Sequence, residues 1–139
     1  MSRLIFERDF PSTTTAVADT LTDVLEFLAQ QRWINAQNTF CIRLCLEEAL
    51  VNAVVHGNDS EASRRVRVRI FDDGDTCRVC VHDEGKGFDV DAVEMADCSQ
   101  LGGRGVCLIK EFMEDVRFNP QAKCLEMVFN RNTFSEACA

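Results

Sequence analysis

The chain has 139 residues, a length that suits one domain around a single hydrophobic core and cannot hold two. Hydrophobic residues make up 46% and charged residues 27%, which excludes the disordered and collagen-like classes, so residues 1–139 are expected to form one domain. The net charge of −8 argues against direct binding to nucleic acid, because such proteins neutralise phosphates with clustered lysine and arginine.

No apolar run in the sequence is long enough to cross a bilayer. The first ten residues, MSRLIFERDF, also lack the apolar stretch and the cleavage site of a signal peptide. We therefore expect a cytoplasmic location and no membrane partner.

The eight cysteines are expected to be free, core-filling thiols, because a chain of this size without a secretion signal keeps its cysteines reduced. Cys77 and Cys80 have C-x-x-C spacing, but on a strand an odd separation points them to opposite faces. Cys41 and Cys45 lie one helical turn apart, and nothing in the sequence joins the two pairs into one site. Structural zinc is therefore disfavoured.

The first half of the chain predicts a strand and two helices. Residues 3–10 alternate as a strand does, and residues 11–13, Pro-Ser-Thr, supply a break and a helix cap. The helix that follows runs to about residue 31 on one apolar stripe, made of Val17, Leu21, Val24, Leu25 and Leu28. A second helix is expected from Asn35 or Ala36 to His56, and Gly57 is expected to stop it.

The second half predicts two hairpins on either side of a loop and a helix. Alternation in residues 66–70 and 77–81, around a turn at 72–75, indicates an antiparallel pair. A loop, an irregular acidic stretch and a helix follow, and closing strands are expected near residues 115–119 and 123–130. Strands grouped in adjacent pairs indicate an α+β two-layer sandwich, a mostly antiparallel sheet with helices on one face, and disfavour a parallel sheet.

The one basic run, RRVRVRI at residues 64–70, alternates arginine with aliphatic residues. This pattern favours a solvated strand face, with the aliphatic residues turned toward the core. It leaves open a second interpretation, an edge that docks an acidic protein partner.

Glu48, Asn52 and His56 are spaced four apart on the second predicted helix, so their side chains are expected to stack along one face. Asn52 stands among aliphatic neighbours, where burying an unpaired amide would cost roughly 1–3 kcal/mol. A carboxylate and an amide oxygen one turn apart suit Mg²⁺, which takes oxygen ligands and keeps several waters. The alternative is an internal polar pair, with Asn52 bonded to neighbouring backbone.

Two glycine-rich segments follow along the chain. In DEGKGFD, residues 83–89, the glycines allow the backbone to turn sharply and approach a flat ligand, although a plain turn uses the same residues. In GGRGV, residues 102–106, the glycines open a helix whose free N–H groups and dipole attract phosphate, although glycine clusters also serve as connectors.

Taken in order, the three segments resemble the N, G1 and G2 boxes of the GHKL ATPase superfamily, which includes histidine kinases, gyrase and MutL. Within it, EEALVNAVVHG, VHDEGKGFD and GGRGVCLIKEFMEDV resemble the anti-sigma-factor serine kinases of the RsbW type over nearly the full length. The resemblance implies the Bergerat ATP-binding fold, with ATP and Mg²⁺ as ligands.

The resemblance also implies a role for each matching residue. Asn52 would ligate Mg²⁺, and Glu48 would be the general base that activates an attacking hydroxyl group. Asp83 would accept a hydrogen bond from the adenine amino group, while Gly85 and Gly87 would let the backbone close around the base. The phosphates would be held at the helix start by Gly103, Arg104, Gly105 and Val106.

Three further expectations accompany these roles. Residues 88–102 would form a mobile lid over the nucleotide, consistent with their lack of periodicity. Glu47 lies about 100° around the helix from Glu48 and is expected to be exposed. His56 is expected to cap the end of its helix.

For function, the resemblance implies a serine kinase that phosphorylates a STAS-domain antagonist and sequesters a sigma factor or an equivalent regulator, with a homodimer also implied. One alternative is a nucleotide-gated binding module without kinase activity. Glu48 favours the kinase, because a module that only binds has no need of a base. The other alternative, the ATPase domain of a sensor histidine kinase, is disfavoured because no helical hairpin carrying a phosphoacceptor histidine is recognised.

Overall fold

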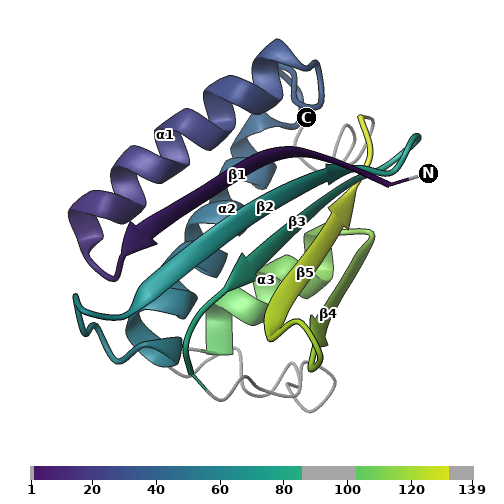
Figure 1. Ribbon diagram of the computed structural model, residues 1–139. Helices are drawn as coiled ribbons and strands as arrows, with labels where there is room; N and C mark the ends of the chain where they lie inside the picture. The colour runs from purple at the N-terminus through teal and green to yellow at the C-terminus, as the bar shows by residue number, and fades with distance from the viewer. Residues whose placement is uncertain (1, 86–102, 132–139) are drawn as a thin grey trace.

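Within the described residues, five antiparallel strands form one layer of the protein and the helices form the other (Figure 1). The computed structural model describes residues 2–85 and 103–131, and over residues 103–106 it describes the backbone alone. In chain order the elements are β1 (Arg3–Pro11), α1 (Thr14–Gln30), α2 (Thr39–Asn52), the π-helix η1 (Ala53–Gly57), β2 (Arg65–Asp72), β3 (Cys77–His82), α3 (Gly103–Phe112), β4 (Asp115–Asn119) and β5 (Cys124–Phe129). The predicted α+β sandwich is confirmed.

The strands follow the order β1-β2-β3-β5-β4, so β3 lies in the middle of the sheet. The register pairs Val68 with Val81 and Val81 with Leu125, which aligns the apolar positions of three strands on one face. Because side chains alternate along a strand, the predicted two-residue periodicity of β2 and β3 is enough to turn this face toward the helices. The hairpin predicted from the alternation is confirmed.

The helices cover that face and close the core. The hydroxyl of Thr13 caps α1 by accepting a hydrogen bond from the Ala16 N–H at 3.2 Å, as its place after the proline predicts. The side chains that α1 buries are Val17, Thr20, Leu21, Val24 and Leu28. Trp33 follows α1, is 1% exposed, and packs edge-on against Phe129 of β5 with ring centroids 6.4 Å apart.

The second helix begins later than predicted, at Thr39 instead of Asn35 or Ala36. The side chain of Asn35 accepts hydrogen bonds from the backbone N–H groups of Gln37 at 2.8 Å and Asn38 at 3.1 Å. Such a turn satisfies backbone donors locally and competes with helix formation. An apolar periodicity cannot reveal this competition, because it depends on one side chain.

The opposite face of the sheet carries the basic run, and two of its arginines, Arg67 and Arg69, form ion pairs across the strands. Arg67 bonds to Asp9 at 2.8 Å and Arg69 to Glu7 at 2.6 Å, in both cases across β1 and β2. The hydrogen bond to Arg67 lowers the pKa of Asp9 below its ordinary value. These cross-strand pairs support the solvated strand face over an edge for an acidic partner.

The six cysteines within the described residues divide into two groups. The free thiols among them, all buried, are Cys45, Cys77, Cys80 and Cys124, as predicted. Cys41 and Cys107 are disulfide-bonded, so the prediction of free thiols is wrong for these two. A disulfide forms only where the packing of distant segments brings two sulfur atoms together. The spacing of cysteines along the chain does not show where this happens. Cys77 and Cys80 do point to opposite faces, since they pair with Phe129 and Glu126 respectively.

No helix in the described ranges, 2–85 and 103–131, is both long enough and apolar enough to cross a membrane.

We predict that Ile70→Ala, at a side chain with 0% exposure in β2, lowers the free energy of unfolding by about 2–5 kcal/mol, because it leaves a cavity between sheet and helices. Leu4→Ala is the control, because Leu4 near the start of β1 is 47% exposed. It is expected to change the free energy of unfolding by about 0.5 kcal/mol or less. Urea unfolding of both variants measures the difference, and equal losses would contradict this location of the core.

Candidate nucleotide-binding site

The segments singled out from the sequence meet at one end of the sheet (Figure 1). There α2 continues into η1, β3 ends at His82, and α3 begins at Gly103. η1 contacts the chain after β3, and α2 contacts α3. The three sequence motifs therefore belong to one site.

Glu48 and Asn52 lie one turn apart near the end of α2, and both side chains are half-buried. Within the described residues, neither the Glu48 carboxylate nor the Asn52 amide has a hydrogen-bond or ion-pair partner. The interpretation of Asn52 as part of an internal polar pair is therefore not supported. Glu47 is exposed, as predicted. The face of α2 presents a carboxylate and an amide that are free to bind a ligand.

His56 lies beyond the α-helical part of this face. Residues Ala53–Gly57 form a π-helix, in which the Asn58 N–H bonds to the Ala53 carbonyl at 2.9 Å, five residues back. The regular α-helix that the spacing of Asn52 and His56 predicted therefore ends at Asn52. His56 is exposed and lies in the last turn of η1. A basic side chain there suits the negative end of the helix dipole, as expected for a cap.

Gly57 and Gly85 let η1 and the chain after β3 approach each other at backbone distance. A Cβ at Gly57 would lie 2.2 Å from Oδ2 of Asp83, and a Cβ at Gly85 would lie 2.3 Å from the carbonyl oxygen of Gly57. A side chain at Gly85 would therefore force the two backbones apart, and one at Gly57 would displace the Asp83 carboxylate. The helical segment ends at Gly57, as predicted. The left-handed backbone that often follows a helix end occurs later, at Asp59 and Ser60, with φ of 53° and 56°.

Asn58 ties this junction together and was not identified from the sequence. Its side chain has 0% exposure; Oδ1 accepts a hydrogen bond from the Glu84 N–H at 2.7 Å. Its Nδ2 donates to Oγ of Ser12 at 2.9 Å and to the carbonyl oxygen of Arg65 at 3.0 Å. One amide thus joins the end of η1 to the starts of α1 and β2 and to the residue after Asp83. Asparagine after glycine is typical of a turn, and this local pattern does not reveal the burial of the side chain.

Asp83 is held by this junction. Its Oδ1 accepts a hydrogen bond from the Gly85 N–H at 2.8 Å. Burial raises the pKa of Asp83, and the hydrogen bond from Gly85 only partly opposes that rise. A carboxyl group with a raised folded-state pKa stabilises the fold below its unfolded pKa and loses that contribution as pH rises through its folded pKa. At neutral pH the ionised Asp83 therefore costs stability, a feature typical of functional carboxylates.

The helix α3 packs beside α2. The Cys45 thiol on α2 approaches the carbonyl oxygen of Leu108 on α3 at 4.0 Å, and burial together with the charge of Glu48 raises the pKa of that thiol to about 12. The first turn of α3 consists of residues 103–106, so the predicted phosphate-binding segment does open a helix. The side chains of Arg104 and Val106 are not described, and Gly87 and residues 88–102 lie outside the described residues.

A groove of about 340 Å³ lies elsewhere, between α1 and α2. It is lined by Thr14, Val17, Ala18, Leu21, Thr22, Leu25, Arg43, Glu47, Val51, Val54 and Val55. None of the candidate ligand-binding residues belongs to this lining. The candidate ligand-binding residues therefore belong to the end of the sheet and not to this groove.

A family profile described as the histidine kinase-like ATPase domain matches residues 10–129. The chain belongs to this family. Histidine kinase-like ATPases are part of the GHKL superfamily, so the chain is an ATP-binding module of the class that carries out ATP-dependent phosphotransfer or ATP hydrolysis. The match contains all three motifs, and the predicted superfamily is confirmed.

Among solved structures, the chain is similar to the histidine kinase domain from the blue-light activated histidine kinase of Erythrobacter litoralis, with a TM-score of 0.53 and 20% sequence identity. The similarity covers 88% of this chain and 64% of that one, so the chain spans less than two thirds of its length. At this identity the likeness establishes the histidine kinase-like fold alone. No curated protein shows significant sequence similarity to the chain.

We predict that Asn58→Ala lowers the free energy of unfolding by about 1–3 kcal/mol, because it removes a buried hydrogen bond to Ser12 and two part-buried bonds to the backbone of Glu84 and Arg65. Amide exchange at Glu84 is expected to accelerate as well. Asn119→Ala is the matched control, since Asn119 also accepts two backbone hydrogen bonds but in an exposed turn, where water replaces them. The same loss of stability in both variants would show that Asn58 does not hold the junction.

Proposed function

We propose that the chain is a protein-serine kinase and anti-sigma factor of the RsbW type. It would transfer the γ-phosphoryl group of ATP to a serine of a STAS-domain antagonist and sequester a sigma factor or an equivalent regulator. The observation that supports this most directly is the half-buried pair Glu48 and Asn52, unpartnered within the described residues, on the helix whose continuation η1 meets Asp83 and Gly85 at Gly57.

The described residues fit ATP and Mg²⁺. Glu48 and Asn52 offer the oxygen donors that Mg²⁺ prefers, and Asn52 is the proposed ligand. The glycine contact beside Asp83 leaves no room for another side chain, so its carboxylate is the polar group available to an adenine amino group. The N–H groups in the first turn of α3, from Gly103 to Val106, would meet phosphate oxygens. Bound Mg-ATP would supply the phosphoryl group and offset charge that develops during transfer.

Glu48 distinguishes the kinase from the two alternatives. A serine hydroxyl must lose its proton as it attacks, and Glu48 would accept it. A neutral imidazole attacks through a lone pair, so a histidine acceptor has less need of that base. A module that only binds protein has no need of it at all. The partner-switching role, possible dimerisation and a cytoplasmic location belong to this proposal through the resemblance to RsbW-type kinases.

The acceptor residue tests this function. Partners captured from the native host with Mg-ATP and with Mg-ADP would be incubated with the purified chain and γ-labelled ATP. We expect acid-stable, alkali-labile label on a serine of a STAS-domain protein, because phosphoserine is an ester. Acid-labile label on histidine would support a sensor kinase, and nucleotide-dependent capture without any label would support a binding module.

We predict that Glu48→Gln binds ATP nearly as the wild type does but slows phosphotransfer by about 100-fold or more, because an amide keeps the shape and loses the base. Glu47→Gln, at the exposed neighbouring position, is the control and is expected to retain activity. Calorimetric titration with Mg-ATP and single-turnover transfer separate binding from chemistry. Transfer at the wild-type rate by Glu48→Gln would rule out Glu48 as the base.

We predict that the wild type prefers ATP to GTP by at least about 100-fold, or roughly 2.7 kcal/mol, because an ionised Asp83 accepts from an amino group and repels a carbonyl. Asp83→Ala is expected to weaken ATP more than GTP. Asp75→Ala, in the exposed turn between β2 and β3, is expected to keep the preference. If Asp83→Ala remains as selective as the wild type in nucleotide titrations, Asp83 does not contact the base.

A further inference from the structure

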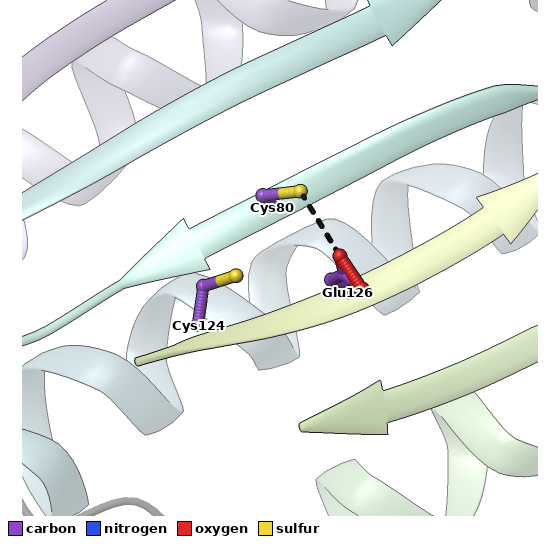
Figure 2. Close-up of side chains that lie close together, drawn as sticks. All are labelled: Cys80, Cys124 and Glu126. Atoms are coloured by element: carbon purple, nitrogen blue, oxygen red, sulfur yellow. Dashed lines mark hydrogen bonds between the residues drawn. The ribbon is translucent and has the colours of Figure 1, made fainter. Parts of the chain in front are cut away.

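Cys80, Cys124 and Glu126 form a cluster that spans β3 and β5 (Figure 2). One ligand atom from each residue, the two Sγ atoms and a carboxylate oxygen, lies within 4.8 Å of the other two. The register places Cys80 opposite Glu126 and Cys124 opposite His82, so all three share one face of the sheet. The spacing of these three residues is set by the backbone pairing of two regular strands and not by a loop.

The cluster is buried although it lies on the face that the helices do not cover; in Figure 2 the helices pass behind the two strands. Cys80 and Cys124 are each 2% exposed and Glu126 is 7% exposed. A glutamate this buried requires partners, and Glu126 has Arg78 at 3.6 Å and Arg117 at 3.4 Å. Arg78 is itself fixed by Asp73 at 3.0 Å, so the rim of the cluster is ordered.

The donor atoms and their spacing suit a thiophilic cation. Two thiolates and a carboxylate are zinc ligands, and atoms bound tetrahedrally to one zinc ion lie roughly 3.6–3.8 Å apart, given bond lengths of about 2.3 Å to sulfur and 2.1 Å to oxygen. The Sγ of Cys80 lies 4.0 Å from Oε2 of Glu126, a few tenths of an ångström above that spacing, and every ligand-atom pair lies within 4.8 Å, so binding needs a contraction of at most about 1 Å. Magnesium is a poor match, because it requires oxygen ligands.

A disulfide between the two thiols fits the sheet less well. Cys80 and Cys124 are diagonal neighbours, since each pairs directly with a different residue. Diagonal positions on antiparallel strands lie about 7–8 Å apart, which exceeds the separation of about 6.8 Å that a disulfide spans without backbone movement. The register therefore keeps the sulfurs near each other as two separate ligands.

The charges around the cluster also suit a divalent cation. With protonated thiols, the carboxylate of Glu126 faces two guanidinium groups, those of Arg78 and Arg117. Cysteine ligands bind metal as thiolates, so two protons would leave as one divalent cation enters and the net charge would not change. Arg78, whose Nη1 lies 3.5 Å from the Cys80 sulfur, would then donate to a metal-bound thiolate.

We propose that Cys80, Cys124 and Glu126 bind one thiophilic divalent cation, best matched by Zn²⁺, with a fourth position open to water. The site is separate from the oxygen donors Glu48 and Asn52 on α2. A bound ion would join β3 to β5 close to Asp83, which follows β3 directly. The inference does not depend on the proposed kinase activity.

Zinc titration of the full chain, purified under mild reduction and competed against a chromophoric chelator, tests the site. We expect one ion bound with cysteine ligands, and Co²⁺ in its place would show a thiolate-to-metal charge-transfer band. Cys80→Ser and Cys124→Ser are each expected to lose at least about tenfold in affinity, since even outer contacts of a metal site contribute that much. Glu126→Gln is expected to weaken binding too.

Cys77→Ser is the matched control, because Cys77 is a buried thiol on the same strand with its side chain on the opposite face. It is expected to bind zinc as the wild type does. If a serine variant fails to fold, alkylation mapped by mass spectrometry on the wild type gives the answer, since zinc would protect Cys80 and Cys124. Equal loss in Cys77→Ser and Cys80→Ser, or no protection of Cys80 and Cys124, would overturn the site.

Discussion

The contact between Gly57 and Gly85 controls how the nucleotide-binding end of this protein is assembled. Because neither residue has a Cβ, the last turn of η1 and the chain leaving β3 meet backbone to backbone, with the Asp83 carboxylate against Gly57. Asn58 then completes the junction from within by bonding to Glu84, Arg65 and Ser12. Without this approach the end of the helical segment that carries Glu48 and Asn52 would not meet the chain that leaves β3 at Asp83.

The same junction shows where stability is given up for ligand binding. Burial disfavours the charged form of Asp83, and Glu48 and Asn52 have no partners within the described residues. The regular α-helix also ends immediately after Asn52, where the π-helix η1 begins, and His56 in the last turn of η1 is exposed. These groups lower the stability of the ligand-free protein. ATP and Mg²⁺ would provide them with binding partners.

The sheet carries different chemistry on its two faces. Toward the helices it is apolar and holds the core, whereas the opposite face is an array of arginines and carboxylates that neutralise one another across β1, β2, β3 and β5. Long arginine side chains cover this second face in place of helices, and the three-residue cluster Cys80, Cys124 and Glu126 is buried beneath them. β3 connects both features to the nucleotide site, because it contributes Cys80 and leads to Asp83.

Local patterns in the sequence determined the elements. Alternation in β2 and β3, the apolar stripe of α1 and the motifs around Asn52, Asp83 and Gly103 predicted the sandwich and the superfamily, because residues two or four apart share a face whatever surrounds them. Contacts between distant positions were decided only by tertiary structure: the fit of Gly57 against Gly85, the burial of Asn58, the disulfide bonding of Cys41 and Cys107, and the cluster across β3 and β5. Strand register and helix packing create those neighbours, and neither is encoded in the spacing of residues along one segment.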